Sequence, residues 1–507
     1  MINELDLSCL LLLSWCIQKI DLLSFVKLVV IILYFIVDIK ILFLDFRNAR
    51  YQGFMIIVIM KILLFCIVHI FFDYADPNSC RTNLQQDDRK WMSTKTGYRQ
   101  IVKDLEHEKK LELPSCSPAH LWTVVRHGTR YPSKKAIRLM LEDIPRLRDR
   151  ILAQKSGSLC DEDRALLDDW SLDVELDQSK NLHVEGDSEM ILLGERWLSR
   201  LPELLSHYDE ARYTLRSTDT ERSQRSGNGF ITGLWTRVMV PRVSWHVIRD
   251  EHDPLIRFYK LCDAWIADVK KNPAANIERE EFERSDVMME VEHSVSSYLG
   301  TNLSLEDLDM MYLMCNFDTA WTPNKTSPWC RLFSDQELRV MEYREDLEYF
   351  WIDGPGHDIN SDQACVLVKD MVDTFNSIAE GRGERHGSFY FTHSGTILKL
   401  LAFLEVFEDS EPLKSDNFHK MTSRKWRTSE IGPFGANIAF VLQHCRTDFK
   451  MALFVNEKLT KLPGCEEEWC TLNSFIRNNP QLKSCNFGNI CRRDNLTVKD
   501  NVPDDKY

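Results

Sequence analysis

Three short apolar runs, each followed by a polar loop and then a helical pattern, restrict the fold more than any other feature of this sequence. The runs cover residues 121–125, 213–215 and 388–391, the helical patterns that follow them cover 136–152, 220–238 and 396–407, and two further runs cover 436–442 and 449–455. All five runs are short and rich in Val, Ile, Phe and Tyr, which is typical of buried strands. Strands that lead directly into helices predict an α/β fold with a mainly parallel sheet and flanking helices.

The segment from 246 to 375 has a different composition. It is charged and helical, with glutamate-rich stretches at 279–292 and 335–349 and few β-branched runs. We therefore predict a helical cap at 246–375, inserted into an α/β domain formed by residues 76–245 and 376–507.

The first 75 residues do not match the rest, because residues 8–73 are almost entirely apolar. In one interpretation, residues 22–44 and 54–72 are transmembrane helices that anchor the protein, although Asp38 and Lys40 are costly inside a bilayer. In the other, which we favour, residues 60–75 are a secretory signal that starts at Met60 and ends at a small residue, and 1–59 are an extension absent from the mature protein. The favoured interpretation predicts a secreted protein.

Cysteine usage agrees with secretion. The sequence has 15 cysteines; the three at positions 9, 16 and 66 lie in the apolar leader, and the rest form an even set that suits disulfides in an oxidising compartment. Zinc is the alternative for the pairs Cys465/Cys470 and Cys485/Cys491, but their spacing is at or beyond the usual limit for structural zinc, so we predict disulfides. Sequons at Asn302, Asn324 and Asn495 predict a glycoprotein.

The net charge of the chain restricts its partners. With 63 Lys and Arg against 77 Asp and Glu, the formal charge is −14, so bulk electrostatics does not draw this protein to nucleic acid. Any site for an anion must therefore be a local cluster of positive charge.

One such cluster is the motif Arg126-His127-Gly128-Thr129-Arg130, which directly follows the apolar run 121–125. Two arginines beside a histidine repel a metal cation and are costly to bury unpaired. They suit a phosphate dianion, because guanidinium groups bind phosphate bidentately and a neutral imidazole acts as a nucleophile. Gly128 allows a tight turn, so that both arginines face one point.

Two further residues stand at the ends of predicted strands. Arg216 closes the run 213–215, and His393 follows the run 388–391. Ligands of open α/β sheets bind beyond the carboxyl ends of the strands, so we expect Arg126, His127, Arg130, Arg216 and His393 to converge on one positive pocket.

These residues carry a resemblance to a known family. The Arg-His-Gly-x-Arg-x-Pro motif at 126–132, the later Arg216 and the strand ending at His393 resemble the histidine acid phosphatases, and further stretches resemble the multiple inositol polyphosphate phosphatases: 93–99, 311–315, 327–330, 359–361 and 424–427. The resemblance implies an α/β domain with an inserted helical domain and a reaction that needs neither metal nor cofactor. It implies that His127 attacks phosphorus and becomes a phosphohistidine, while Arg126, Arg130, Arg216 and His393 bind the phosphoryl oxygens.

The sequence departs from this family in one position that matters. The family carries Ala-Glu after the second histidine, and its relatives carry Asp, to protonate the leaving alkoxide; here Ser394 and Gly395 stand there. General-acid catalysis is worth about 10²–10⁴ in rate. Two hypotheses follow: a hydrolase of inositol polyphosphates that is slow or borrows an acid such as Asp219 or Glu221, or a secreted pseudophosphatase that binds polyphosphorylated ligands with little turnover. A phosphoryl-transfer mutase is a more distant alternative.

Overall fold

The structure is a computed structural model that describes residues 80–81, 91–102, 111, 113–383, 386–446 and 448–492. The chain divides into two compact units, 1–76 and 77–507, and everything described here belongs to the second. The apolar leader, its two interpretations and the sequon at Asn495 lie outside the described residues. Within the part that the structure describes, no helix is both long enough and apolar enough to cross a membrane.

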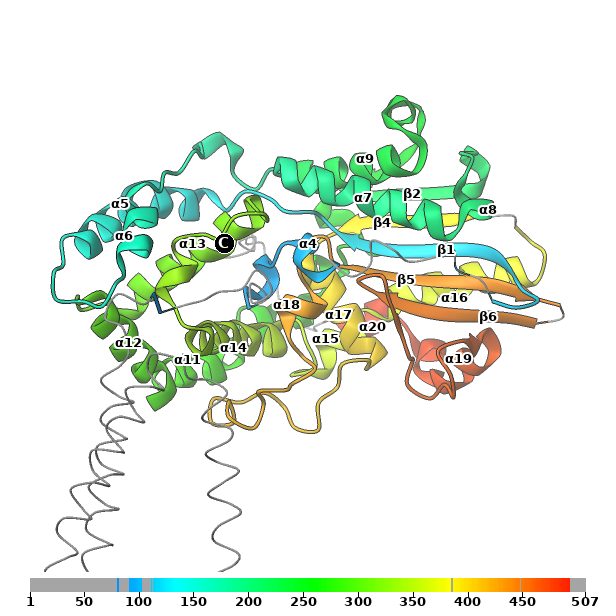
Figure 1. The fold of residues 1–507 in the computed structure, drawn as a ribbon. Helices are drawn as coiled ribbons and strands as arrows, with labels where there is room; N and C mark the ends of the chain where they lie inside the picture. Colours follow the sequence, from blue (N-terminus) through cyan, green and yellow to red (C-terminus); the bar gives the residue numbers. More distant parts are fainter. Residues whose placement is uncertain are drawn as a thin grey trace, which may run out of the picture. The chain divides into compact units, whose positions relative to one another are not determined.

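An eight-stranded mixed sheet forms the centre of the second unit (Figure 1). Its strands are β1 (Ser117–Arg126), β2 (Tyr213–Thr218), β3 (Trp245–Ile248), β4 (Gly387–Thr392), β5 (Asn437–Cys445), β6 (Asp448–Val455), β7 (Lys458–Thr460) and β8 (Cys470–Thr471). Their order is β3-β2-β4-β1-β5-β6-β7, and β8 also pairs with β6. The half from β3 to β1 is parallel, whereas β5 to β8 are antiparallel.

The predicted α/β fold with flanking helices is therefore confirmed, with one refinement. The sheet is mixed rather than mainly parallel, because β5 and β6 form a hairpin that pairs antiparallel with β1. Those two runs are not followed by a helical pattern in the sequence, and a hairpin needs no crossover helix.

Helices cover both faces of the sheet because the strands are apolar on both faces. Alternate residues of β1 enter different cores: Trp122 packs in one and Leu121 in the other. The first core includes side chains of α16 (Cys365–Ala379) and α17 (Ser394–Leu404), and the second includes side chains of α7 (Val184–Arg200) and α9 (Glu221–Trp235).

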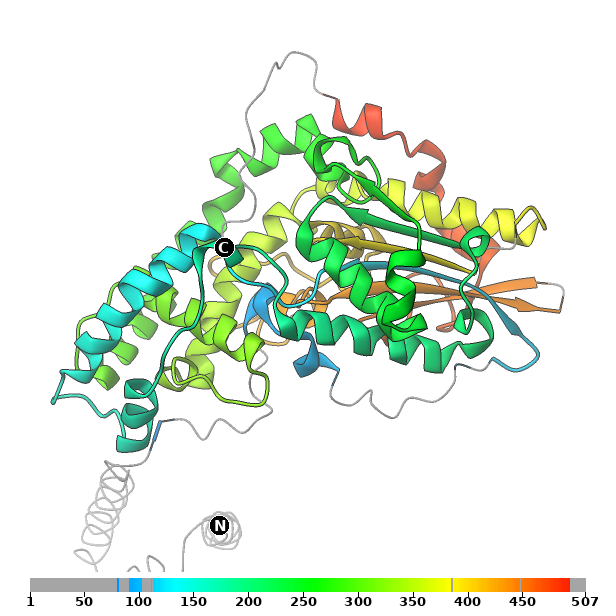
Figure 2. The same cartoon turned by 90° about the horizontal axis from the view of Figure 1, so that it is seen from above.

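A group of helices lies beside the sheet in both views (Figures 1 and 2). It comprises α5 (Lys134–Leu152), α6 (Asp161–Asp168), α11 (Ile277–Glu283), α12 (Asp286–Leu299), α13 (Leu305–Trp321) and α14 (Asp335–Ile352). Capping boxes at Ser304 and Ser334 begin α13 and α14. Four of these helices lie inside the predicted insertion, but α5, which packs against α13, and α6 precede it. The boundaries at 246 and 375 remain a prediction.

Every cysteine from Cys80 to Cys491 is in a disulfide. The pairs are Cys80–Cys160, Cys116–Cys445, Cys262–Cys491, Cys315–Cys330, Cys365–Cys485 and Cys465–Cys470. The preference for disulfides over zinc is thus confirmed at Cys465 and Cys470. Cys485 and Cys491, considered together in the sequence, pair instead with cysteines of two different helical segments.

The disulfide between Cys116 and Cys445 joins the outer ends of the neighbouring strands β1 and β5. It spans 329 residues, whereas the Cys465–Cys470 bridge spans 5. Because a cross-link over a longer loop removes more entropy from the unfolded chain, we expect the Cys116→Ser/Cys445→Ser variant to lose about 2–4 kcal/mol of unfolding free energy. Denaturant titration measures this, and the Cys465→Ser/Cys470→Ser variant is the matched control, with a smaller loss. Equal losses would contradict the prediction.

Candidate active site

The carboxyl ends of three parallel strands lie side by side. In the pairing of β1 with β4, Arg126 is opposite Thr392, and β4 pairs on its other side with β2. His127 and His393 are the first residues beyond β1 and β4, and the backbone N–H of His127 donates to the carbonyl of Thr392 at 3.0 Å. The two imidazole rings consequently lie 5.5 Å apart, centroid to centroid.

His127 is buried, with 1% of its surface exposed. Its Nδ1 lies 2.9 Å from the carbonyl oxygen of Gly128; since a carbonyl only accepts, Nδ1 carries the proton and the lone pair is on Nε2. Burial lowers the pKa of His127 well below its usual value, and the charges of Arg222, Arg126 and Arg130 act in the same direction. The imidazole is therefore neutral and suited to nucleophilic attack.

The loop after His127 is clamped by α7. Glu189 of that helix accepts from the backbone N–H of Thr129 at 2.8 Å and from its hydroxyl at 2.9 Å. Burial raises the pKa of Glu189 to about 7, although its hydrogen bonds act in the opposite direction. The backbones also touch: a Cβ on Gly128 would lie 2.5 Å from the carbonyl oxygen of Gly186. Only glycine permits this approach.

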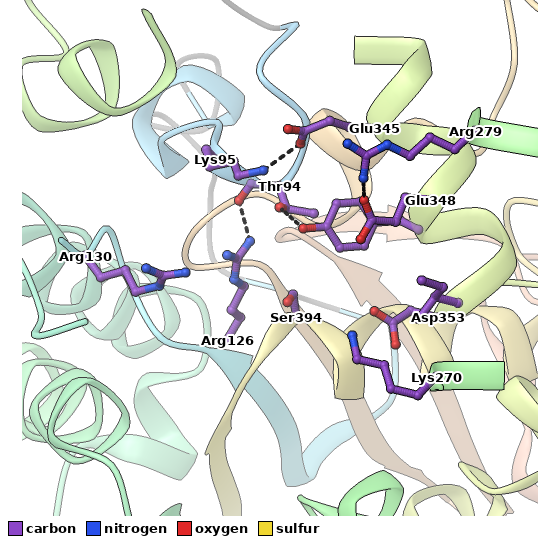
Figure 3. A pocket seen from close by; sticks show the side chains of 12 residues that line it. Thr94, Lys95, Arg126, Arg130, Lys270, Arg279, Glu345, Glu348, Asp353 and Ser394 are labelled. Carbon is purple, nitrogen blue, oxygen red and sulfur yellow. Dashed lines mark hydrogen bonds and ion pairs between the residues drawn. The ribbon is translucent and has the colours of Figure 1, made fainter. Parts of the chain in front are cut away.

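Of the five residues expected to converge on one pocket, Arg126 and Arg130 line the pocket of Figure 3. Arg126 is anchored by bonds from Nη1 to the carbonyls of Thr94 and Gly432, at 2.6 and 2.7 Å. Arg130 donates from Nη1 to the Tyr131 carbonyl at 2.8 Å. Both guanidinium groups are buried, so their positions are defined before any ligand binds.

The second histidine is held by a third arginine. Arg222, in the first turn of α9, lies with Nη2 3.3 Å from Nδ1 of His393. A guanidinium only donates, so Nδ1 accepts, and Nε2 donates to the Thr218 hydroxyl at 3.0 Å. Burial lowers the pKa of His393 well below its usual value, as do the nearby charges of Arg257, Arg222, His127 and Lys260.

Arg216 is placed differently from the other four predicted residues. Its guanidinium forms a two-pronged ion pair with Asp253, at 2.6 and 3.3 Å. It stands two residues before the end of β2, whereas the charge of Arg222, in addition to burial, lowers the pKa of both His127 and His393. The structure therefore brings Arg222, rather than Arg216, to the two histidines.

The sequence itself contains a signal for Arg222. It lies in the first turn of the helix after β2, and a first turn that follows a strand points toward the carboxyl edge of the sheet. Arg216, although at the end of the predicted run, is inside the observed strand.

The suggested substitute acids lie elsewhere. Asp219 accepts from the side-chain amide of Gln224, and Glu221 accepts from the backbone of Leu182 and from Arg225. Neither lines the pocket of Figure 3. Three other carboxyl groups line this pocket: Glu345, Glu348 and Asp353. Ser394 also lines it, as do three further basic residues, Lys95, Lys270 and Arg279.

Comparison with known proteins agrees with this geometry. Residues 119–456 match the model of the histidine phosphatase superfamily (branch 2). Multiple inositol polyphosphate phosphatase 1 of Gallus gallus is 30% identical over 439 residues, which cover 81% of this chain and 95% of the relative. Multiple inositol polyphosphate phosphatase 1 of Homo sapiens is 29% identical over 74% of this chain and 82% of the relative.

The solved structures show the same fold at low identity. The phytase from D. castellii aligns with a TM-score of 0.66 at 16% identity, covering 81% of this chain and 89% of that chain. Multiple inositol polyphosphate phosphatase of Bifidobacterium longum aligns with a TM-score of 0.59 at 15% identity, covering 77% and 97%. The resemblance inferred from the motifs is confirmed: this chain belongs to branch 2 of the histidine phosphatase superfamily, within the multiple inositol polyphosphate phosphatase family.

Proposed function

We propose that this phosphatase hydrolyses phosphomonoesters of inositol polyphosphates through a phosphohistidine at His127. The observation that carries the proposal is the buried, neutral His127 with its lone pair on Nε2, surrounded by the charges of Arg126, Arg130 and Arg222. The relatives named as multiple inositol polyphosphate phosphatases and phytases support the substrate class. None of the comparisons supports the alternative of phosphate binding without turnover.

In the proposed mechanism, Nε2 of His127 attacks phosphorus, and the bond from phosphorus to the ester oxygen breaks with its electron pair on that oxygen. Guanidinium groups of Arg126, Arg130 and Arg222 stabilise the charge that spreads over the phosphoryl oxygens, and His393 positions Arg222 through Nδ1. Water then attacks the phosphohistidine and releases inorganic phosphate. The arginines need little rearrangement, because backbone carbonyls and His393 already hold them.

The charge of the pocket suits a substrate with several phosphates, because five basic residues line it against three acidic ones. Lys95, Lys270 and Arg279 line it beyond the catalytic arginines, on segments far apart in the sequence. In a chain of net charge −14, this local excess of cations favours a small polyanion.

The main test is phosphate release from inositol hexakisphosphate between pH 3 and 8. We expect turnover, and we expect His127→Ala to abolish it while inorganic phosphate still binds. Because the pKa of His127 is lowered, the nucleophile stays neutral as pH falls below about 6.5, where an ordinary histidine becomes protonated. Activity should therefore persist at pH 5. Wild-type turnover by His127→Ala would refute the assignment.

A second test asks which of Arg222 and Arg216 binds phosphate. Arg222→Met should weaken competitive inhibition by inorganic phosphate at least 10-fold, because the variant lacks a charge beside both histidines. Arg216→Met is the matched control: it leaves the buried Asp253 without its ion-pair partner, which costs about 3–5 kcal/mol of stability, with little change in the inhibition constant. The assignment is wrong if Arg216→Met weakens phosphate binding as much as Arg222→Met does.

We also propose that the mature protein is secreted after cleavage near residue 76. The six disulfides and the exposed sequon residues Asn302 and Asn324 support an oxidising compartment. N-terminal sequencing of protein from the culture medium should find a start close to residue 76. A membrane-bound form that retains residues before Met60 would favour the anchored alternative.

A further inference from the structure

A carboxyl group lies where the residue after Ser394 has no side chain. The position of a Cβ on Gly395 is 3.4 Å from Oδ1 of Asp353. Asp353 directly follows α14, more than forty residues earlier in the chain, and lines the same pocket as Arg126, Arg130 and Ser394. Figure 3 shows its side chain next to Lys270.

The proposed reaction needs a proton at this place. An inositol alkoxide is a poor leaving group unless its oxygen is protonated as the bond to phosphorus breaks. Ser394 and Gly395, at the start of α17 beside His393, offer no group that is acidic enough. The donor must reach the ester oxygen from a side chain that lines the pocket.

Two of the three carboxyl groups that line the pocket, Glu345 and Glu348, form ion pairs with Lys95 and Arg279. Glu345 accepts a hydrogen bond from Lys95 at 2.6 Å. Burial alone would raise the pKa of Glu345, but the charges of Lys95 and Arg279 hold this pKa below its usual value. Glu348 is paired with Arg279. Figure 3 shows Glu345 beside Lys95 and Glu348 beside Arg279. Asp353 is the carboxyl group beside the start of α17.

Lys399 holds Asp353 in this position. It lies one turn after Gly395 on α17, its side chain is 0% exposed, and its ammonium donates to Oδ1 of Asp353 and to the carbonyl of Ile352 at 3.2 Å. The rings of Trp265 and Tyr259 enclose it, with centroids 4.2 and 5.4 Å from Nζ. Lys399 thus engages Oδ1 and holds the carboxyl group in place beside the start of α17.

We propose that Asp353 is the proton donor of this phosphatase, positioned by Lys399 in the space left open at Gly395. This assignment rests on the proposed function and names a further catalytic residue of the same site. As His127 Nε2 forms its bond to phosphorus, the ester oxygen takes the electron pair of the breaking bond and the proton of Asp353. In the second step, the carboxylate of Asp353 accepts a proton from the water that attacks the phosphohistidine, so the cycle closes with no other reactant.

The test compares substrates whose leaving groups differ in their need for a proton. Asp353→Asn keeps an oxygen for Lys399 and removes only the acid. We expect it to lower kcat about 10²-fold or more on inositol hexakisphosphate and glycerol 2-phosphate, with far less effect on p-nitrophenyl phosphate, whose phenolate leaves unprotonated. Phosphate inhibition should stay near wild type, whereas Tm should fall, because the buried ammonium of Lys399 loses its ion-pair partner.

Two controls match the substitution. Asp373→Asn changes an exposed aspartate of α16 whose side chain is 61% exposed, and it should leave all three substrates unaffected. Glu348→Gln removes a different pocket carboxyl group, and any loss should be equal for the alkyl and aryl esters. An equal loss on both classes for Asp353→Asn would overturn the assignment.

A second variant keeps the proposal testable if Asp353 also stabilises the fold, because it supplies a new carboxyl group at position 395. In an Asp353→Ala background, where the neighbouring carboxyl group is gone, Gly395→Glu should recover alkyl ester turnover at least 10-fold while changing the aryl ester little. Absence of recovery in a folded protein that still binds phosphate would count against the donor site.

Failure of the Asp353 assignment can be distinguished from failure of the proposed function. Turnover of glycerol 2-phosphate without turnover of inositol hexakisphosphate would reject the proposed substrate class and still test Asp353. Absence of turnover on every ester by the wild-type protein would reject both.

Discussion

The parallel pairing of β1 with β4 is the constraint on which the site depends. It places Arg126 opposite Thr392, so the two residues that follow these strands, His127 and His393, emerge side by side at one edge of the sheet. The hydrogen bond from the backbone N–H of His127 to the carbonyl of Thr392 continues the pairing of the two strands by one residue and fixes the position of the nucleophile. A shift of one residue in this register would turn one imidazole to the opposite face.

Neutrality of the histidines follows from the same arrangement. Burial at the end of the sheet disfavours a charged imidazole, and the arginines that are needed for phosphate make protonation still less favourable. The arginines in turn are kept apart by specific acceptors: backbone carbonyls for Arg126 and Arg130, and a histidine nitrogen for Arg222. A site that concentrates cations in this way is preorganised for an anion.

Rigid support comes from the helices that cover the sheet. The carboxylate of Glu189 and the close contact of Gly186 with Gly128 fix the loop after β1 against α7. On the other side, α17 starts at Ser394 and carries Lys399, whose buried ammonium ties the end of α14 to the pocket. The acid that we assign to Asp353 thus depends on packing between helices that are distant in sequence.

The sequence by itself determined five of the eight strands, the helices that follow three of them, the disulfide chemistry and the arginine–histidine motif. These are local properties: apolar runs, turn residues and adjacent charges act within a few residues of one another. The sequence did not determine that β5 to β8 are antiparallel, that Arg222 and not Arg216 reaches the histidines, or that a carboxyl group from α14 lies beside Gly395. Only the tertiary structure decided these features, because each depends on which strand or helix becomes the neighbour of another, and such contacts are set by the packing of the whole core.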